Sequence, residues 1–325
     1  MSQQAKLLAY SQGPFQKPLA TLECRYPKFI HAEALTHRIL EIQPNLHVSL
    51  MVPDGLMYDQ NLSRNASSSR AIPVKRLIED VLSDPVIPMV FGKNQSGMAA
   101  RQNFEGAEAQ EAKRLWLQAR DAAVLHAQKL SDFGVHKQIV NRIIEPFCHI
   151  KVVITGTEWN NFFGLRMHKD AQPEICDLAT QMYDLMQRRQ PKPLAMGEWH
   201  LPYIEDYDWD KADEYARKDR ITRDIPQHTE LLEIVKKVSV ARCARTSYNN
   251  FEGKISTIEE DIKLYDFLVV AVPLHASPAE HQATPDILFQ SYVCNSPSWN
   301  EPSKHGNLMG YLQLRKLLPN ECIPG

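Results

Sequence analysis

The sequence predicts an α+β protein with a twisted, mostly antiparallel sheet flanked by helices. Segments with helical periodicity and segments with strand alternation both occur, and they mix without the βαβαβ rhythm of a parallel sheet. The chain has 325 residues, of which 43% are hydrophobic and 23% charged, as in globular proteins that bury a core. We expect a single domain over residues 1–325.

The first predicted elements are a strand and a helix near the start of the sequence. Residues 20–25 alternate apolar and polar side chains, which predicts a strand, and Pro27 fits the first turn of a helix that runs towards Arg38. Residues 40–61 have no period and contain two prolines and a glycine, so we expect an inserted loop there. Residues 189–226 are rich in Pro, Tyr, Trp and Asp, and we expect a surface excursion.

The middle of the chain gives the clearest periodicity. In residues 107–130, apolar side chains recur on one face at spacings of three and four, which predicts a helix that Gly134 is placed to end. Residues 149–155 are rich in β-branched side chains and predict a strand.

Polar residues then predict where helices begin. Thr157 can cap a short helix, and Asp170 can cap the helix after it. Residues 229–240 are helical in pattern. Residues 256–259 read Ser-Thr-Ile-Glu, a capping box that predicts a last helix running through Leu268.

Composition excludes several classes of protein. The formal net charge of −2 provides no basic field for nucleic acid. Residues 1–10 lack the pattern of a signal peptide, and the longest apolar run, residues 267–272, is far too short to span a bilayer. The six cysteines are scattered without C-x-x-C spacing, so we expect free thiols in a reducing cytoplasm.

Residues 63–70 read Ser-Arg-Asn-Ala-Ser-Ser-Ser-Arg and follow, after the expected loop, Thr36-His37-Arg38. Hydroxyl groups and backbone N–H groups can surround phosphate oxygens, and Arg70 can bind them bidentately. This pattern predicts an anion-binding surface. Taken alone, however, the pattern is more often that of a solvated serine-rich loop.

Three further segments are individually ambiguous. Residues 136–146 carry Arg142, which alone is an ordinary surface charge. Residues 157–166 carry polar and phenylalanine side chains that also suit an amphipathic helix. Residues 244–248 read Ala-Arg-Thr-Ser-Tyr, and residues 274–281 place two histidines six apart with a glutamate. That spacing matches no zinc pattern, so we expect no metal.

Together these four segments resemble the flavin-dependent thymidylate synthase family, whose signature is H-R-x-x-S-x-N-E-x-S-x-R. His37-Arg38 corresponds to its head and residues 63–70 to its tail. Residues 157–172 resemble the family's N-F-L-x-L-R…A-Q segment, and residues 244–281 resemble its flavin-contacting segment. The resemblance implies reductive methylation of dUMP to dTMP through FAD, with NADPH and methylenetetrahydrofolate as co-substrates, in a homotetramer whose sites are shared between subunits.

The resemblance also implies roles for individual residues. Those against FAD would be His37, Arg38, Asn161, Ser247, His275 and Ser277. Those that hold dUMP would be Glu33, Ser68, Ser69, Arg70, Arg142 and Arg166. Arg70 would lie near the phosphate, and Arg166 would lie near the pyrimidine with a catalytic role. Reduced flavin rather than a cysteine would activate the pyrimidine, so the protein would contribute positioning and electrostatics.

Four departures from the family pattern leave alternatives open. The flavin-contacting segment comes last, as after circular permutation, and residues 40–61 split the signature. Ala66 replaces the family's Glu and Thr36 its usual Arg, while Glu33 falls where the family has Gln. A related enzyme that modifies another pyrimidine nucleotide, or a disabled nucleotide-binding homologue, therefore stays possible. A hydrolase using Ser68 has no G-x-S-x-G elbow to support it.

Overall fold

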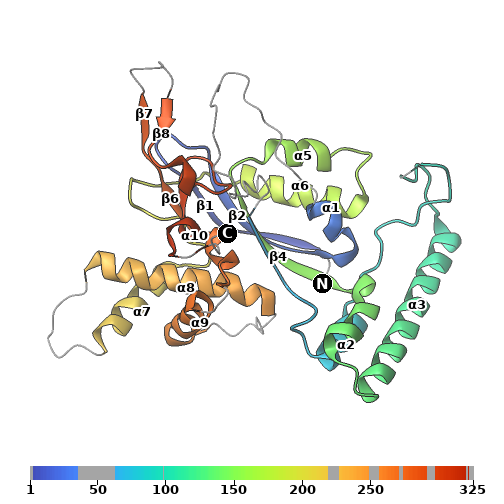
Figure 1. Ribbon diagram of the computed structural model, residues 1–325. Helices are drawn as coiled ribbons and strands as arrows, with labels where there is room; N and C mark the ends of the chain where they lie inside the picture. The colour runs from blue at the N-terminus through green and yellow to red at the C-terminus, as the bar shows by residue number, and fades with distance from the viewer. Residues whose placement is uncertain are drawn as a thin grey trace.

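A five-stranded sheet with helices on both faces forms the centre of the protein (Figure 1). The structure is a computed structural model, and it describes residues 3–35, 63–97, 99–218, 227–248, 256–270, 274–290, 297–319 and 321. The strand order is β3-β4-β2-β1-β5, in which the short β5 pairs parallel with β1 and all other neighbours are antiparallel. The predicted α+β class with a mostly antiparallel sheet is confirmed.

The elements have the following bounds. The strands of the central sheet are β1 (Gln4–Gln12), β2 (Leu19–Pro27), β3 (Ser63–Ala66), β4 (His149–Gly156) and β5 (Lys192–Pro193). Two small sheets pair β6 (Ala283–Pro285) with β9 (Tyr311–Gln313), and β7 (Leu288–Gln290) with β8 (Pro297–Trp299). The helices are α1 (His31–Leu35), α2 (Val74–Ser83), α3 (Gly106–Asp132), α4 (Lys137–Val140), α5 (Asn160–Arg166), α6 (Pro173–Gln187), α7 (Asp206–Arg217), α8 (His228–Tyr248), α9 (Ile258–Val270) and α10 (Leu314–Leu317). Short 3-10 helices are η1 (Lys28–Ile30), η2 (Asn141–Ile143), η3 (Glu145–Phe147), η4 (Ser277–Glu280) and η5 (Pro302–Lys304).

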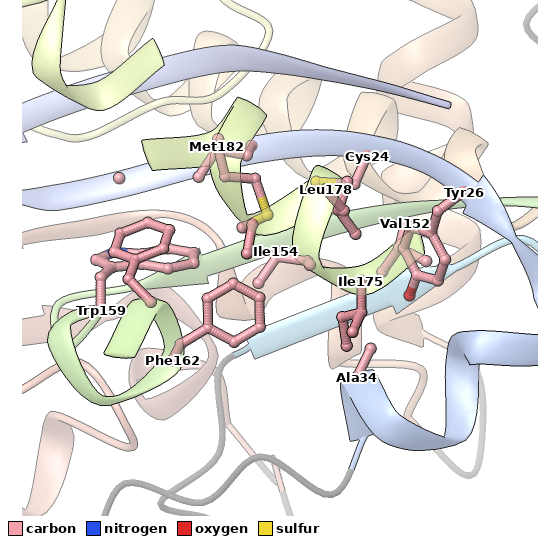
Figure 2. Close-up of a cluster of buried hydrophobic side chains, with 14 of the residues drawn as sticks. Cys24, Tyr26, Ala34, Val152, Ile154, Trp159, Phe162, Ile175, Leu178 and Met182 are labelled. Carbon is pink, nitrogen blue, oxygen red and sulfur yellow. The ribbon is translucent and has the colours of Figure 1, made fainter. Parts of the chain in front are cut away.

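One face of the sheet is apolar and packs on α5 and α6 (Figure 2). Alternate residues of a strand point to the same face, so Cys24 and Tyr26 of β2 lie together with Val152 of β4. Leu178 and Met182 of α6 cover them and are fully buried. Burying a side chain of this size stabilises the fold by about 1.5–3 kcal/mol, so this layer is the main core.

The opposite face of the sheet is polar, and α8 covers part of it. Thr21 of β2 lies opposite Thr155 of β4, and their hydroxyl oxygens are 2.7 Å apart. Asn65 of β3 donates a hydrogen bond of 2.6 Å from its side-chain amide to the backbone carbonyl of Cys243 in α8. Residues 235–246 of α8 are buried around almost the whole helix, as expected for a helix packed on several sides.

Buried ion pairs join α8 to its neighbours α7 and α9. Arg242 binds Asp208 of α7 through two hydrogen bonds of 2.7 and 2.8 Å, and its Nε donates to Asp261 of α9 at 3.1 Å. Arg245 also donates to Asp261, which is fully buried. Because both carboxylates are paired and hydrogen-bonded, the cost of burying their charge is offset.

The predicted helices are largely confirmed, while two of the predicted caps are wrong. The helix predicted at 107–130 is α3, and Gly134 follows it at a φ of 96°, where glycine is favoured. Thr157 does not cap α5, whose N-cap is Trp159, and Asp170 does not cap α6, whose N-cap is Gln172.

The capping box before α9 is shifted by one residue from its predicted position. Thr257 and Glu260 exchange backbone-to-side-chain hydrogen bonds of 3.0 and 3.2 Å, where Ser256 and Glu259 were expected. Ser256 instead donates to Asp261 at 2.8 Å. The helix itself is confirmed, because either register begins it within one turn.

Irregular structure was expected in two segments, residues 189–226 and residues 40–61. The range 189–226, expected as a surface excursion, contains β5 and α7, and Asp208 and Ala212 of α7 are buried. This part of the range is therefore packed, because Asp208 is held by Arg242 of α8. The expected inserted loop at 40–61 lies outside the described residues.

Candidate functional site

The serine-rich segment forms a turn fixed to the first part of β4. The backbone N–H of Ser67 donates to the carbonyl of Lys151 at 2.8 Å, and the N–H of Lys151 donates to the Ser67 hydroxyl at 3.1 Å. The N–H of Ala71 donates to the carbonyl of Ser68 at 3.0 Å and closes the turn. Residues 67–71, the serine turn, thus continue β3 past the end of its pairing with β4.

Asn141 of η2 holds the serine turn from the other side. Its amide nitrogen donates to the carbonyls of Ser69 at 2.7 Å and Ile72 at 2.9 Å, and the side chain has no exposed surface. Two separate carbonyls on either side of Arg70 are therefore held by one side chain. Its Oδ1 is buried without a hydrogen-bond partner in the described part of the chain.

Replacing Asn141 with alanine is expected to lower the free energy of unfolding by about 2 kcal/mol, since two buried carbonyls lose their donor. Urea unfolding followed by circular dichroism measures this change. Asn103, exposed before α3, is a matched control whose replacement by alanine should change stability by less than about 0.5 kcal/mol. An unchanged unfolding midpoint for Asn141→Ala would show that the turn is held by other contacts.

The serine turn gathers more positive than negative charge. Arg70 is exposed and makes no hydrogen bond or ion pair with the described residues. Arg142 of η2, 57% exposed, lies 3.2 Å from a carboxylate oxygen of Glu145, and the ammonium of Lys28 lies 2.6 Å from the same oxygen. Ser69 also donates to this oxygen. Two cations contact this one carboxylate, and Arg70 adds a further positive charge on the turn, so a net attraction for an anion remains.

Glu145 is ionised at neutral pH in this setting. Its burial acts to raise the pKa, but hydrogen bonds from Lys28 and Ser69 and the charge of Arg142 hold the pKa of this carboxyl below its ordinary value. The cluster of Lys28, Arg142 and Glu145 therefore combines two cations with an ionised carboxylate, beside the turn that carries Arg70. Such a cluster beside serine hydroxyls is suited to a phosphate group.

A cavity of about 530 Å³ lies between α2 and the polar face of the sheet. Ser67 of the serine turn and Ile72, which follows the turn, are among the residues that line it. Its volume falls within the range of small-molecule sites. Charged side chains from the sheet and from α2 line it: Lys6, Glu23, Arg25, Arg76, Asp80 and Lys151.

His149 lies in the same cavity and is neutral. Burial, together with the guanidinium of Arg25 at 2.9 Å from Nδ1, lowers the pKa of His149 to about 4. Arg25 itself is bound to Asp84 at 2.7 Å. The cavity thus offers both charge signs and a neutral imidazole, and it shares an edge with the serine turn.

Three of the six residues expected against flavin, Asn161, His275 and Ser277, belong to segments at the other end of β3. Ser63 pairs with Thr155 and Ala66 with Val152, so the serine turn follows the end of β3 that lies away from Thr155. Asn161 is the second residue of α5, shortly after β4 ends, and Arg166 ends this helix. From Ser63 to Ser68, five steps of extended chain span on the order of 15 Å. One chain therefore separates the serine turn from Asn161, and Arg166, which was predicted to hold dUMP, lies on the same helix as Asn161.

His275 and Ser277, both exposed, lie before and within η4. The end of η4 packs near Ser63, because Gln313 donates to the Ser63 hydroxyl at 3.3 Å and to the Glu280 carbonyl at 3.1 Å. His281 follows η4 and lies 2.8 Å from the Thr155 hydroxyl. The structure thus brings the segments of Asn161, His275 and Ser277 to one end of the sheet.

This end of the sheet has polar groups that fit a cofactor. The Thr157 hydroxyl is buried and has no hydrogen-bond partner among the described residues, and it lies between β4 and α5. Asn161 is half-buried, while His275 and Ser277 expose an imidazole and a hydroxyl. These donors and acceptors suit the heteroatoms of an isoalloxazine ring.

Four predicted residues cannot be placed in either group. His37 and Arg38 lie outside the described residues. Glu33 lies in α1 and Ser247 in the last turn of α8, but the structure does not describe their side chains. Their roles stay predictions.

Sequence reasoning missed Lys28 and Asn141 and gave Glu145 no role. Glu145 and Pro146 were noticed beside Arg142, but nothing in the order of residues showed that the carboxylate meets Ser69, which is 76 positions away. Asn141 carried a weak signal, since it lies with Arg142 between the apolar pairs Ile139-Val140 and Ile143-Ile144. Lys28 carried none.

Among the residues that the structure describes, no group of three histidine, cysteine or acidic side chains is placed to hold a metal ion. In the same part of the chain, no helix is both long enough and apolar enough to cross a bilayer. Cys24, Cys148, Cys176 and Cys243 are free thiols. Burial raises the pKa of Cys148 to about 12 and raises those of Cys24 and Cys243 further, so none of these three is a ready nucleophile.

Comparison with solved structures finds a UMP/dUMP methylase, PolB from Streptomyces cacaoi. The complex with 5-Br UMP is 16% identical, with 58% of this chain and 90% of that chain covered and a TM-score of 0.40. The complex with 5-Br dUMP is 15% identical, with 58% and 91% covered and the same TM-score. No curated protein matches the chain.

Comparison with protein families matches residues 6–192 to the family described as thymidylate synthase complementing protein. The match covers more than half of the chain and extends from β1 through the serine turn and α6 to the first residue of β5. It includes Arg70, Arg142 and Arg166, while residues 244–281 lie outside it. The chain therefore belongs to the thymidylate synthase complementing protein family of methyltransferase-type enzymes.

Proposed function

We propose that this protein is a flavin-dependent thymidylate synthase that converts dUMP to dTMP, with FAD as cofactor and with NADPH and methylenetetrahydrofolate as co-substrates. The observation that carries the proposal is the serine turn, where Arg70 and Arg142 lie beside two serine hydroxyls on a backbone held by Asn141. A nucleoside monophosphate offers the dianion that such a turn binds.

In this proposal residues of the serine turn and Arg142 bind the phosphate, and two other residues bind the base. Ser68, Ser69, Arg70 and Arg142 hold the phosphate, while Glu33 and Arg166 contact the pyrimidine. Arg166 has the catalytic role, because a guanidinium stabilises negative charge that develops on the base.

The flavin site is proposed at the end of the sheet where α5 begins. His37, Arg38, Asn161, Ser247, His275 and Ser277 would hold FAD. When bound, flavin supplies the redox chemistry, and the side chains of this chain bind and orient it and exclude water. Three of the described cysteine thiols are buried with raised pKa values, which favours a reaction that needs no thiol nucleophile.

We further propose that complete sites form between subunits of a homotetramer. The serine turn and the segments of Asn161 and His275 lie at opposite ends of β3 in one chain, so a nucleotide at the turn would meet flavin residues from a second chain. We also propose that residues 1–325 form one catalytic domain in the reducing cytoplasm, that its segment order is circularly permuted, and that residues 40–61 are an insertion.

The purified protein, after loading with FAD, is expected to show flavin absorbance and to release tritium from 5-tritiated dUMP when given NADPH and methylenetetrahydrofolate. Omitting each co-substrate in turn is the control. A protein that remains colourless after incubation with FAD would contradict the proposal.

A second candidate, a related enzyme that modifies another pyrimidine nucleotide, is favoured by Ala66. This residue lies in β3, half-buried, where the family signature has a glutamate. Assaying UMP, dCMP and dUMP side by side, each with tritium at C5, distinguishes the two. A disabled homologue instead predicts that deletion of residues 40–61 switches on dUMP-dependent flavin oxidation.

A further inference from the structure

The carboxylate of Glu145 lies where an anion would be expected in the serine turn. One of its oxygens accepts from the Ser69 hydroxyl, lies 3.2 Å from Arg142 Nη1 and lies 2.6 Å from Lys28 Nζ. A hydroxyl, a guanidinium and an ammonium therefore converge on one carboxylate oxygen. These are the donor types that a phosphate oxygen also binds.

The position of Glu145 allows it to compete with a ligand. Its side chain is 19% exposed and projects from η3, a single turn that contains Pro146. The backbone of the serine turn is held by Asn141 and by Lys151, not by Glu145. The carboxylate can therefore leave its three donors without loss of the contacts that shape the turn.

We propose that Glu145 is an internal anion that occupies the phosphate-binding donors of the serine turn and sets how strongly the turn binds a phosphate. This inference rests on the proposed function, in that the phosphate belongs to the substrate. Its carboxylate neutralises part of the positive charge of Lys28 and Arg142. A phosphate must either displace it from Ser69 and Arg142 or bind in its repulsive field.

Replacing Glu145 with glutamine keeps the side-chain shape and a carbonyl oxygen that accepts from Ser69, but removes the charge. We expect Glu145→Gln to bind dUMP about tenfold more tightly, which corresponds to about 1.4 kcal/mol. The affinity of the variant for inorganic phosphate should rise by a similar factor. Deoxyuridine, which lacks the phosphate, should bind with unchanged affinity.

Isothermal titration of the full-length protein with dUMP, inorganic phosphate and deoxyuridine tests this, with thermal unfolding to verify that the variant is folded. Glu111→Gln is the matched control, because Glu111 is an exposed glutamate in an ion pair with Arg114 on α3. It removes the same charge far from the turn and should leave all three affinities unchanged.

Weaker binding of dUMP and phosphate by a folded Glu145→Gln variant would overturn the inference, since Glu145 would then be a support of the turn. An equal rise in affinity for dUMP and for deoxyuridine would also overturn the inference. Failure of the proposed function looks different: wild-type protein and both variants would bind no dUMP, while Glu145→Gln would still bind inorganic phosphate more tightly than Glu111→Gln.

Discussion

Replacing Arg70 with alanine is expected to lower kcat/KM for dUMP by about 100-fold or more while thermal stability stays within about 0.5 kcal/mol of wild type. Arg70 is exposed and makes no hydrogen bond or ion pair in the described part of the chain, so the fold loses little with it. A bidentate contact to a phosphate dianion contributes two charge-assisted hydrogen bonds of about 1.5–3 kcal/mol each. Steady-state kinetics with varied dUMP, together with differential scanning calorimetry, measure both effects.

The control for Arg70 keeps the change in net charge but moves it elsewhere. Arg114→Ala removes an exposed arginine from α3, whose partner is Glu111, and should leave kcat/KM unchanged. Arg70→Lys should fall between wild type and Arg70→Ala, because an ammonium retains the charge without the planar pair of donors. If Arg70→Ala and Arg114→Ala have the same kinetics, the phosphate does not bind at the serine turn.

The sequence predicted the parts of this site that are local in the chain. Residues 63–70 showed their small polar side chains and arginines as a block, and a turn there keeps them together. What could not be predicted is the set of long-range partners. Asn141 and Glu145 reach Ser69 across more than 70 residues, and only the packing of η2 and η3 against the turn brings them there.

The fold shows the same division between local pattern and tertiary contact. The helix α3 follows from periodicity, and β2 and β4 follow from alternation and β-branched side chains. Within 189–226, α7 buries Ala212 and is also held by Asp208, which Arg242 binds. Helical periodicity could not reveal that Asp208 belongs to the buried face of this helix, because charged residues normally indicate the exposed face.

A second set of long-range contacts leads to the other large prediction. A line of hydrogen bonds crosses the polar face of the sheet beneath α8. The Ser11 hydroxyl lies 2.9 Å from Nδ1 of His200, and the Nε2 of His200 lies 2.8 Å from the Thr21 hydroxyl. Thr21 bonds Thr155, whose hydroxyl lies 2.8 Å from Nδ1 of His281. Both imidazoles are buried.

We expect the protein to lose stability steeply as pH falls below about 6.5. Burial lowers the pKa of His200 to about 3, helped by the charge of His281, and burial lowers the pKa of His281 to about 3. Between these values and the unfolded pKa near 6.5, the unfolded chain binds protons that the folded chain does not. Each histidine therefore lowers the free energy of unfolding by about 1.4 kcal/mol per pH unit over this window.

Urea unfolding at several pH values between 6.5 and 5 measures this slope, above the range in which most carboxylates titrate. His281→Asn keeps an amide that can bond Thr155 but removes one titrating group, so its slope should be smaller than that of wild type by about 1.4 kcal/mol per pH unit. His126→Asn, at an exposed position of α3, should keep the wild-type slope. Equal slopes for His281→Asn and wild type would mean that His281 takes up its proton in the folded state, and the buried line of hydrogen bonds would then have to carry a charge.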